Sequence, residues 1–279
     1  MTTWQKVANI DRRILWAIQI VIICAILLRP IGLPIQVGSE TQRFYDFMDN
    51  LPEGSIVWLA YEFAPSGEVE IGPMVTAVFH HAFSRGLRVV GAGLWPIGPH
   101  IAESLLEEII DQYPDVEYGV NYVNLGFNPG QEILARQLVD DVWRTVRNVD
   151  HFGNSLADLP LMAEVPRLTK DYVSAIIVFS EGSPGPEEWL AAVTEPTGIP
   201  QLVGAIQMSV PRMMPYVATG QYAAIIPGAR GTAEYEFLLG QPGSAIAGQD
   251  VMSAMALYLW VLIALGNVAM RFTSSKKRA

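Results

Sequence analysis

Two long apolar stretches near the ends of the chain constrain its fold more than any other feature. They are residues 14–28 (ILWAIQIVIICAILL) and 251–270 (VMSAMALYLWVLIALGNVAM), and neither contains a charged side chain. The second has 20 residues, which at ~1.5 Å per residue is long enough to cross the ~30 Å hydrocarbon core of a bilayer. The two stretches predict one transmembrane helix near each end of the chain.

The first stretch is short for a span, because Arg29 follows after only 15 residues. It lengthens if Arg29 extends its charge outward and residues 31–35 lie in the membrane interface, with Pro30 and Pro34 ending the helix. A cleaved signal peptide is the alternative. No small-x-small cleavage site follows the apolar run, however, and the preceding segment is long and contains Asp11. We expect an uncleaved anchor.

The positions of Lys and Arg predict the orientation in the membrane. Positive charges close to spanning helices favour the cytoplasmic side. Seven lie beyond the outer ends of the two stretches and two lie near their inner ends: Lys6, Arg12, Arg13, Arg271, Lys276, Lys277 and Arg278, against Arg29 and Arg43. We expect a two-pass protein of the cell membrane with both termini in the cytoplasm and the intervening domain outside it.

Domain boundaries and charge follow from this arrangement. Residues 1–36 form a cytoplasmic N-terminus and the first transmembrane helix, 37–249 an extracytoplasmic domain, and 250–279 the second transmembrane helix with a short basic tail.

Residues 36–250 hold 10 basic and 27 acidic side chains, a formal charge of −17. Such a surface repels phosphate backbones, which argues against nucleic-acid binding. The single cysteine, Cys24, cannot form an intrachain disulfide.

The domain alternates apolar runs with amphipathic segments. The first run, residues 56–63 (IVWLAYEF), has no polar alternation, which is typical of a strand covered on both faces of a parallel sheet. We therefore predict a single α/β domain, Rossmann-like, with a mainly parallel sheet of about five strands in the order 3-2-1-4-5. Whether residues 210–240, rich in small side chains, add a strand stays open. The predicted strands are 56–63, 87–93, 119–126, 172–180 and 201–209, and the helices between them are 74–84, 101–113, 131–146 and 187–193.

A repeated Glu-x-x-Pro pattern provides a candidate binding site. Glu62 follows the first predicted strand and Glu181 the fourth. In the predicted order these strands are neighbours at the point where ligands of open α/β sheets commonly bind. Two converging carboxylates either share a proton or chelate Ca²⁺ or Mg²⁺, with Asn124, Gln207 and Ser209 as further oxygen ligands. The alternative is that each glutamate is solvated near the start of the following helix.

Catalytic candidates are few. Ser183 lies in a strand-to-helix turn, but residues 181–185 do not match the Gly-x-Ser-x-Gly elbow. His100 begins the helix after the second strand, on the same rim as Glu62, and is the best-placed acid or base. Its alternative role is an ordinary polar residue in a first helical turn. The sequence contains no Walker loop, HExxH motif or Cys/His metal array.

Two functions remain compatible with these features. The first is a non-catalytic structural or scaffold subunit, anchored in the lipid bilayer, whose domain packs laterally with copies of itself or with other membrane proteins. Few residues lie outside the two apolar stretches on the cytoplasmic side, which favours this function because no output domain is present there. The alternative is an extracytoplasmic enzyme, or a ligand- or divalent-cation-binding domain, that uses the rim around Glu62, His100 and Glu181.

Overall fold

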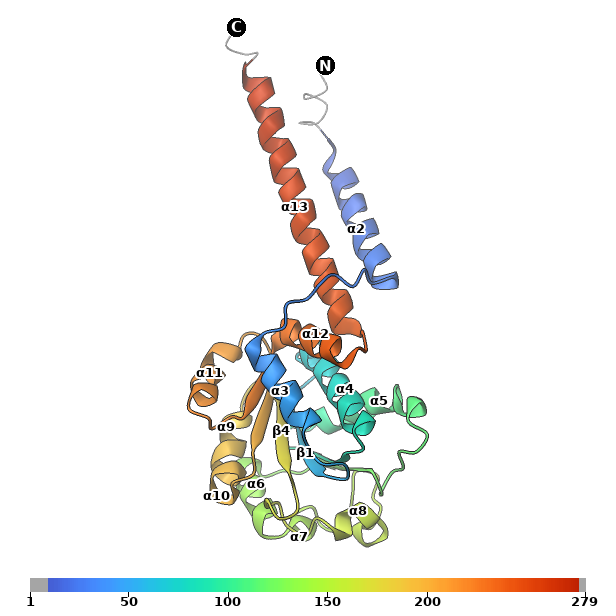
Figure 1. The fold of residues 1–279 in the computed structure, drawn as a ribbon, viewed down its shortest axis with the longest axis vertical. Coiled ribbons are helices and arrows are strands. Elements are labelled where there is room, and N and C mark those ends of the chain that lie inside the picture. The colour runs from blue at the N-terminus through green and yellow to red at the C-terminus, as the bar shows by residue number, and fades with distance from the viewer. Residues whose placement is uncertain (1–9, 276–279) are drawn as a thin grey trace. The chain divides into compact units, whose positions relative to one another are not determined.

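The computed structural model describes residues 10–275, with side chains described as far as residue 271. It contains two compact units (Figure 1). One is the α/β unit Ile35–Gly243, and the other combines the described parts of Met1–Pro34 and Ser244–Ala279. Four of the basic residues used to predict the orientation lie outside the described residues: Lys6, Lys276, Lys277 and Arg278.

The helical unit consists of α2 (Arg12–Leu28) and α13 (Ser244–Ser275). The prediction of a C-terminal helix is confirmed, since Ser244–Arg271 is the one segment of the described chain both long and apolar enough to cross a membrane. The N-terminal stretch is also helical, but α2 has 17 residues, about 26 Å at ~1.5 Å per residue, which falls short of a ~30 Å core.

A buried carboxylate fastens the two helices together. Asp250, 2 % exposed, accepts hydrogen bonds from the backbone N–H groups of Ile31 (2.8 Å), Gly32 (2.7 Å) and Leu33 (3.0 Å). Further along α13, the hydroxyl of Tyr258 donates to the carbonyl oxygen of Leu15 at 2.9 Å. The end of α2 therefore lies near the start of α13, and the pair is antiparallel.

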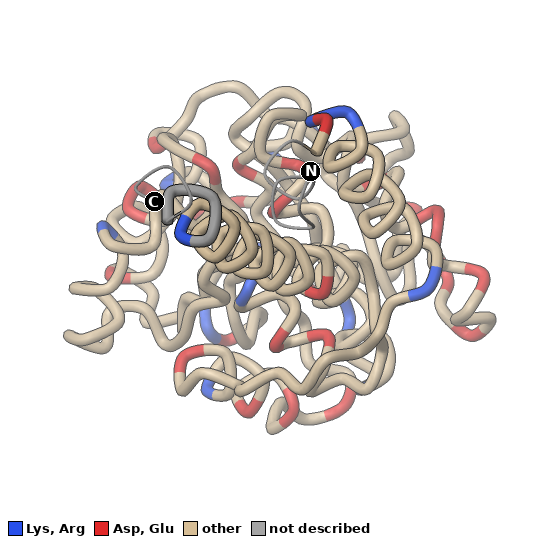
Figure 2. The backbone as a smooth tube through the Cα atoms, turned by 90° about the horizontal axis from the view of Figure 1, so that it is seen from above, with Lys and Arg blue, Asp and Glu red and all other residues tan. Residues whose placement is uncertain are grey.

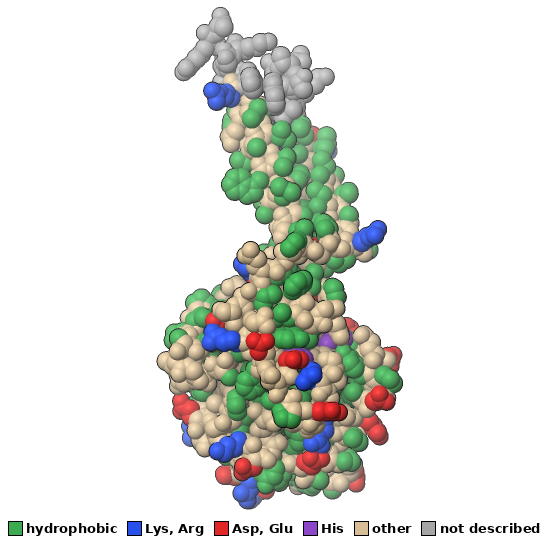
Figure 3. Space-filling model, viewed as in Figure 1, with side chains coloured by type: hydrophobic (Ala, Val, Ile, Leu, Met, Phe, Trp, Pro, Cys, Tyr) green, Lys and Arg blue, Asp and Glu red, His purple; other side chains and the backbone are tan. Residues whose placement is uncertain are grey.

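Both helices expose apolar side chains. Trp16 is 62 % exposed and Trp260 72 %, and apolar side chains cover the visible faces of α2 and α13 (Figure 3). Exposed large apolar groups in contiguous stretches of this kind mark a surface that binds lipid or another protein.

The α/β unit is built on one sheet in which every neighbouring pair of strands is parallel. Its order is β3-β2-β1-β4-β5-β6, which confirms the predicted order of the first five strands and adds a sixth. This is a Rossmann-like arrangement. The strands are β1 (Ile56–Glu62), β2 (Arg88–Gly93), β3 (Tyr122–Phe127), β4 (Ala175–Ser180), β5 (Gln201–Ala205) and β6 (Ala224–Pro227).

Helices cover both faces of the sheet (Figure 1). Along β1, Leu59 and Tyr61 face a core shared with the first layer, and Trp58 and Ala60 face a core shared with the second. The first layer contains α3 (Ser39–Asp49), α4 (Glu68–Ser84), α5 (Gly98–Glu107) and α12 (Gly228–Leu239). The second contains α6 (Gln131–Asp140), α7 (Val142–Thr145), α8 (Pro160–Ala163), α9 (Pro186–Trp189), η3 (Leu190–Thr194), α10 (Glu195–Thr197) and α11 (Val210–Ala218).

Several element boundaries differ from the predicted ones. The helix predicted over residues 131–146 is divided into α6 and α7 by Asp141, whose backbone is extended and whose carboxylate caps Arg144 N. The helix predicted over 101–113 ends at Glu107, before the 3-10 turn η1 (Ile110–Gln112). The segment between α7 and β4 contains the 3-10 turn η2 (Leu156–Asp158) and α8.

Candidate functional site

Strands β1 and β4 lie side by side at the centre of the sheet, where the strand order reverses. Their register pairs Glu62 with Ser180. Glu181 follows the last residue of β4, and its carboxylate accepts from Ser66 Oγ just before α4. The Glu62 carboxylate accepts from Leu94 N and Trp189 Nε1 instead, so the two carboxylates have separate partners in this structure.

Glu62 is fully buried and is held by two parts of its own chain. Its carboxylate accepts a hydrogen bond from Leu94 N at 2.9 Å and another from Trp189 Nε1 at 2.8 Å. Burial raises the pKa of Glu62 to about 8, while these hydrogen bonds and one from Trp95 N act in the opposite direction. Glu62 thus ties the loop after β2 to α9.

The loops that follow β2 and β4 contact each other beside Glu62. Trp95 Nε1 donates to the carbonyl oxygen of Pro184 at 2.8 Å, across the ends of β2 and β4. The peptide bond Ser183–Pro184 is cis. Gly185 has no room for a side chain, since a Cβ atom there would lie 2.2 Å from the oxygen of Gly182. These contacts connect the loops after β2 and β4 at the edge of the sheet where Rossmann-like folds commonly bind a ligand.

Glu181 lies at the beginning of α4. Its carboxylate accepts a hydrogen bond from Ser66 Oγ at 3.1 Å, and a Cβ atom on Gly67 would lie 2.0 Å from Oε2. Gly67 is the N-cap of α4. The alternative considered for the sequence placed this glutamate near the start of the helix that follows it, but the structure places its carboxylate at the start of α4, the helix that follows β1.

Ser183 belongs to a helix cap. Its hydroxyl donates to Glu188, whose other carboxylate oxygen accepts from Gly185 N at 2.7 Å and so caps α9. The Glu188 carboxylate thus joins the Ser183 turn to the start of this helix.

The oxygen groups proposed as additional cation ligands are dispersed. Asn124 is buried, donates to Glu103 Oε2 at 2.8 Å and accepts from Gly126 N at 2.9 Å. Gln207 donates its backbone N–H to Glu70 at 2.8 Å, and Ser209 occupies the N-cap position of α11 without a capping hydrogen bond from its side chain. Within residues 10–275, no group of three or more His, Cys, Asp or Glu side chains is placed to hold a metal ion.

His100 packs against a histidine that sequence reasoning did not connect with it. The ring centroids of His100 and His151 are 4.4 Å apart with an angle of 72° between the ring planes. Burial lowers the pKa of His151, as does the neighbouring His100, whereas Asp150 raises it. The two histidines are 51 positions apart in the sequence. Only the fold brings them together, so no sequence motif signals the pair.

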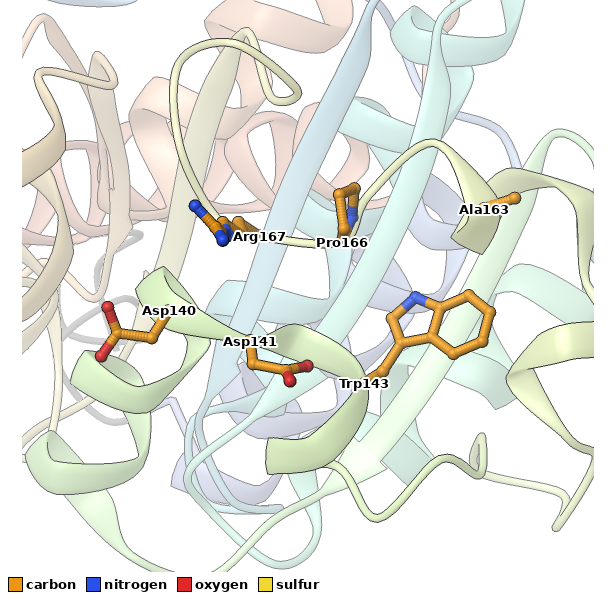
Figure 4. Close-up of a pocket in the computed structure, with 6 residues that line it drawn as sticks. All are labelled: Asp140, Asp141, Trp143, Ala163, Pro166 and Arg167. Atoms are coloured by element: carbon orange, nitrogen blue, oxygen red, sulfur yellow. The ribbon is translucent and has the colours of Figure 1, made fainter.

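A separate surface hollow of about 300 Å³ lies between α6–α7 and the segment that follows α8 (Figure 4). Trp143 and Asp141 line one side of the hollow, and Pro166 and Arg167 line the other. The Asp141 carboxylate accepts from Arg144 N at 2.9 Å, and the Trp143 indole donates to the Met162 carbonyl at 3.0 Å. These two side chains therefore serve local structure.

The chain matches no protein-family model, and no curated protein is similar to it in sequence.

Proposed function

We propose that this protein is a non-catalytic, membrane-anchored scaffold subunit that presents its acidic α/β unit for lateral packing with copies of itself or with other membrane proteins. The observation that carries the proposal is the exposed apolar helix of membrane length, Ser244–Arg271. It accompanies an α/β unit in which Glu62, Trp95 and Trp189 hydrogen-bond to their own chain at the centre of the sheet.

Insertion of both helices into the membrane is part of the proposal. The buried carboxylate of Asp250 and the Tyr258 hydroxyl join α2 to α13 as an antiparallel pair. An antiparallel pair that inserts together has its termini on the same side of the bilayer, in agreement with the excess of Lys and Arg beyond the two apolar stretches. We place that side in the cytoplasm and the α/β unit outside it.

The two ends of the α/β unit are both fastened to α12. The carboxylate of Glu234, 4 % exposed, accepts from Gly38 N at 3.0 Å and from Thr41 Oγ1 at 2.8 Å. Glu236, 3 % exposed, accepts from Gly243 N at 3.0 Å. The first and last segments of the α/β unit are therefore both attached to α12. Two tethers that start from one helix restrict the orientation of the domain and raise its effective concentration in the membrane plane.

The charge of the α/β unit indicates the kind of neighbour. Acidic positions are spread along its backbone and outnumber basic ones (Figure 2). Copies packed side by side would repel one another unless basic groups or cations lie between them. Contacts between copies are therefore expected first through the apolar surfaces of α2 and α13, which carry few charges.

The single cysteine provides a direct test. Cys24 lies on α2 and is exposed, so a nitroxide attached to it gives one spin label per chain. In lipid vesicles, a dipolar distance between labels can arise only between two copies. We expect a defined distance whose signal amplitude falls when labelled protein is mixed with an unlabelled Cys24→Ser chain.

Two results would count against the scaffold proposal. One is a dipolar signal no stronger than that of randomly distributed labels in the same vesicles, combined with a monomeric mass in a maltoside detergent. The other concerns topology: a reporter fused after Ala279 that is active outside the cytoplasm would contradict the proposed orientation.

A further inference from the structure

A polar cavity lies at the carboxyl end of β3, away from the crevice beside Glu62. Its volume is about 260 Å³. The polar side chains that line it are His100, Asn128, Arg147, Asp150 and His151. They come from α5, from the loop after β3 and from the loop after α7, so the folded unit alone assembles them.

The loop that carries His151 is held in a fixed position. His151 N donates to the carbonyl oxygen of Asn124 at 2.8 Å, which attaches the loop to β3. Gly126 has a φ of +69°, and a Cβ atom there would lie 3.0 Å from His151 Nδ1. A glycine at this position therefore makes space for the imidazole. The ring of His100 then packs on that of His151 at a centroid distance of 4.4 Å.

The carboxylate of Asp150 is already fully engaged. One oxygen accepts from Phe152 N (2.9 Å) and Asn154 N (2.7 Å). The other accepts from Tyr118 Oη (2.6 Å) and Asn154 Nδ2 (2.9 Å). A carboxylate with four donors has little remaining capacity to coordinate a cation. Asp150 instead holds the loop that positions His151.

The side-chain N–H donors of Arg147, His100 and His151 make no hydrogen bonds to the described protein. Arg147 has a φ of +61° and lines the cavity, and no salt bridge to its guanidinium exists among residues 10–275. In the same part of the chain, the ring nitrogens of His100 and His151 make no hydrogen bond to protein. A guanidinium offers several N–H groups, and a neutral imidazole offers one.

We propose that this cavity binds a small oxyanion of the size of inorganic phosphate, with Arg147, His100 and His151 as its hydrogen-bond donors. At ~30 Å³ per water molecule, the cavity has room for roughly nine waters, which suits an oxyanion with a short substituent and is below the usual size of a nucleotide or drug site. Arg147 also disfavours a metal ion, because its positive charge repels a cation in the same space. The oxyanion site is independent of the scaffold function.

The test measures phosphate binding to the full chain in a maltoside detergent. Inorganic phosphate is titrated at pH 7 and constant ionic strength, with the melting temperature of the α/β unit and the heat of binding as readouts. We expect a saturable rise in melting temperature, because a ligand that binds only the native state stabilises it. Affinity is expected to fall about tenfold in Arg147→Gln, which removes the positive charge that faces the anion, and in His100→Gln, which replaces the rigid imidazole donor with a flexible amide.

Arg144→Gln is the matched control. This arginine lies three positions before Arg147, is exposed and does not line the cavity, so its loss should leave phosphate affinity unchanged. Equal binding by wild type, Arg147→Gln and His100→Gln, or no saturable binding by a folded wild-type chain, would overturn the oxyanion site. A separate titration with Zn²⁺ covers the other ligand class: stabilisation by Zn²⁺ but not by phosphate, abolished by His100→Gln, would replace the oxyanion with a metal. Either failure leaves the scaffold proposal untouched.

Discussion

The buried carboxyl group of Glu62 makes the stability of the α/β unit depend on pH in a way that can be calculated. In the unfolded chain its pKa is near the ordinary value of 4.5, and in the folded protein burial raises it to about 8. Below pH 4.5 the group is protonated in both states. As pH rises from 4.5 to about 8, the unfolded state releases a proton that the folded state retains, so stability falls.

The size of the effect follows from the same pKa values. At about 1.4 kcal/mol for each tenfold change in proton affinity, the rise from 4.5 to about 8 corresponds to roughly 5 kcal/mol. Glu62→Gln removes the ionisation. Its amide nitrogen then faces one of the two N–H donors, at a cost of about 1–3 kcal/mol. We therefore expect the wild type to be the more stable protein at acidic pH and the variant to be the more stable above pH 8.

Denaturant unfolding in a maltoside detergent, followed by tryptophan fluorescence, measures this difference because Trp58 and Trp189 are buried close to Glu62. The quantity of interest is the wild-type free energy of unfolding minus that of Glu62→Gln at each pH, which cancels the other titrating groups. Glu181→Gln is the control, since that carboxylate is only partly buried. Parallel pH profiles for wild type and Glu62→Gln would refute the reasoning.

Three further substitutions test other parts of the structure. Gly98→Ala should destabilise the α/β unit by about 3 kcal/mol or more, because its Cβ would lie 2.1 Å from the Tyr61 carbonyl oxygen. Gly182→Ala is the control: its nearest contact would be at 3.5 Å, so the melting temperature should change little. Glu234→Ala should cost about 1–3 kcal/mol and speed amide hydrogen exchange in α3, because it leaves the buried Thr41 hydroxyl and the Gly38 N–H at the start of α3 without an acceptor. Unchanged exchange would contradict this role. Burial lowers the pKa of His81 below 6.5, so its contribution to stability is present above pH 6.5 and is lost as pH falls. In His81→Gln the free energy of unfolding should fall less steeply below pH 6.5 than in the wild type. An equally steep fall in both proteins would exclude His81 as its source.

Much of the sheet could be predicted because its strands are long, apolar and separated by helices. Strand β1 (IVWLAYE) is buried at every position, as expected for a strand with helices on both faces. The sixth strand escaped prediction because β6 has only four residues, AIIP, within a glycine- and alanine-rich segment. Its assignment depends on pairing with β5, a long-range contact with no local signal.

The candidate site was harder to predict because it depends on which face each side chain occupies. The sequence places Glu62 and Glu181 at the ends of two neighbouring strands, and the structure agrees. A register shift of one residue decides whether they share a face. The observed pairing of Glu62 with Ser180 separates them. His100 lies at the start of the helix after β2, and the loop after α7 brings His151 against it, a contact that the sequence did not indicate.

Local sequence thus determined the helices, the strands and the parallel arrangement, because apolar periodicity and turn residues act over a few neighbouring positions. Tertiary structure alone decided how the buried carboxylates are used. Asp250 binds backbone groups 217 to 219 residues away, and Glu234 binds groups 193 and 196 residues away. A carboxylate removed from water must find donors wherever the fold supplies them. The two apolar stretches indicated an anchor from the sequence alone. The contacts of Asp250 and Glu234 show how distant segments are joined within the helical unit and within the α/β unit.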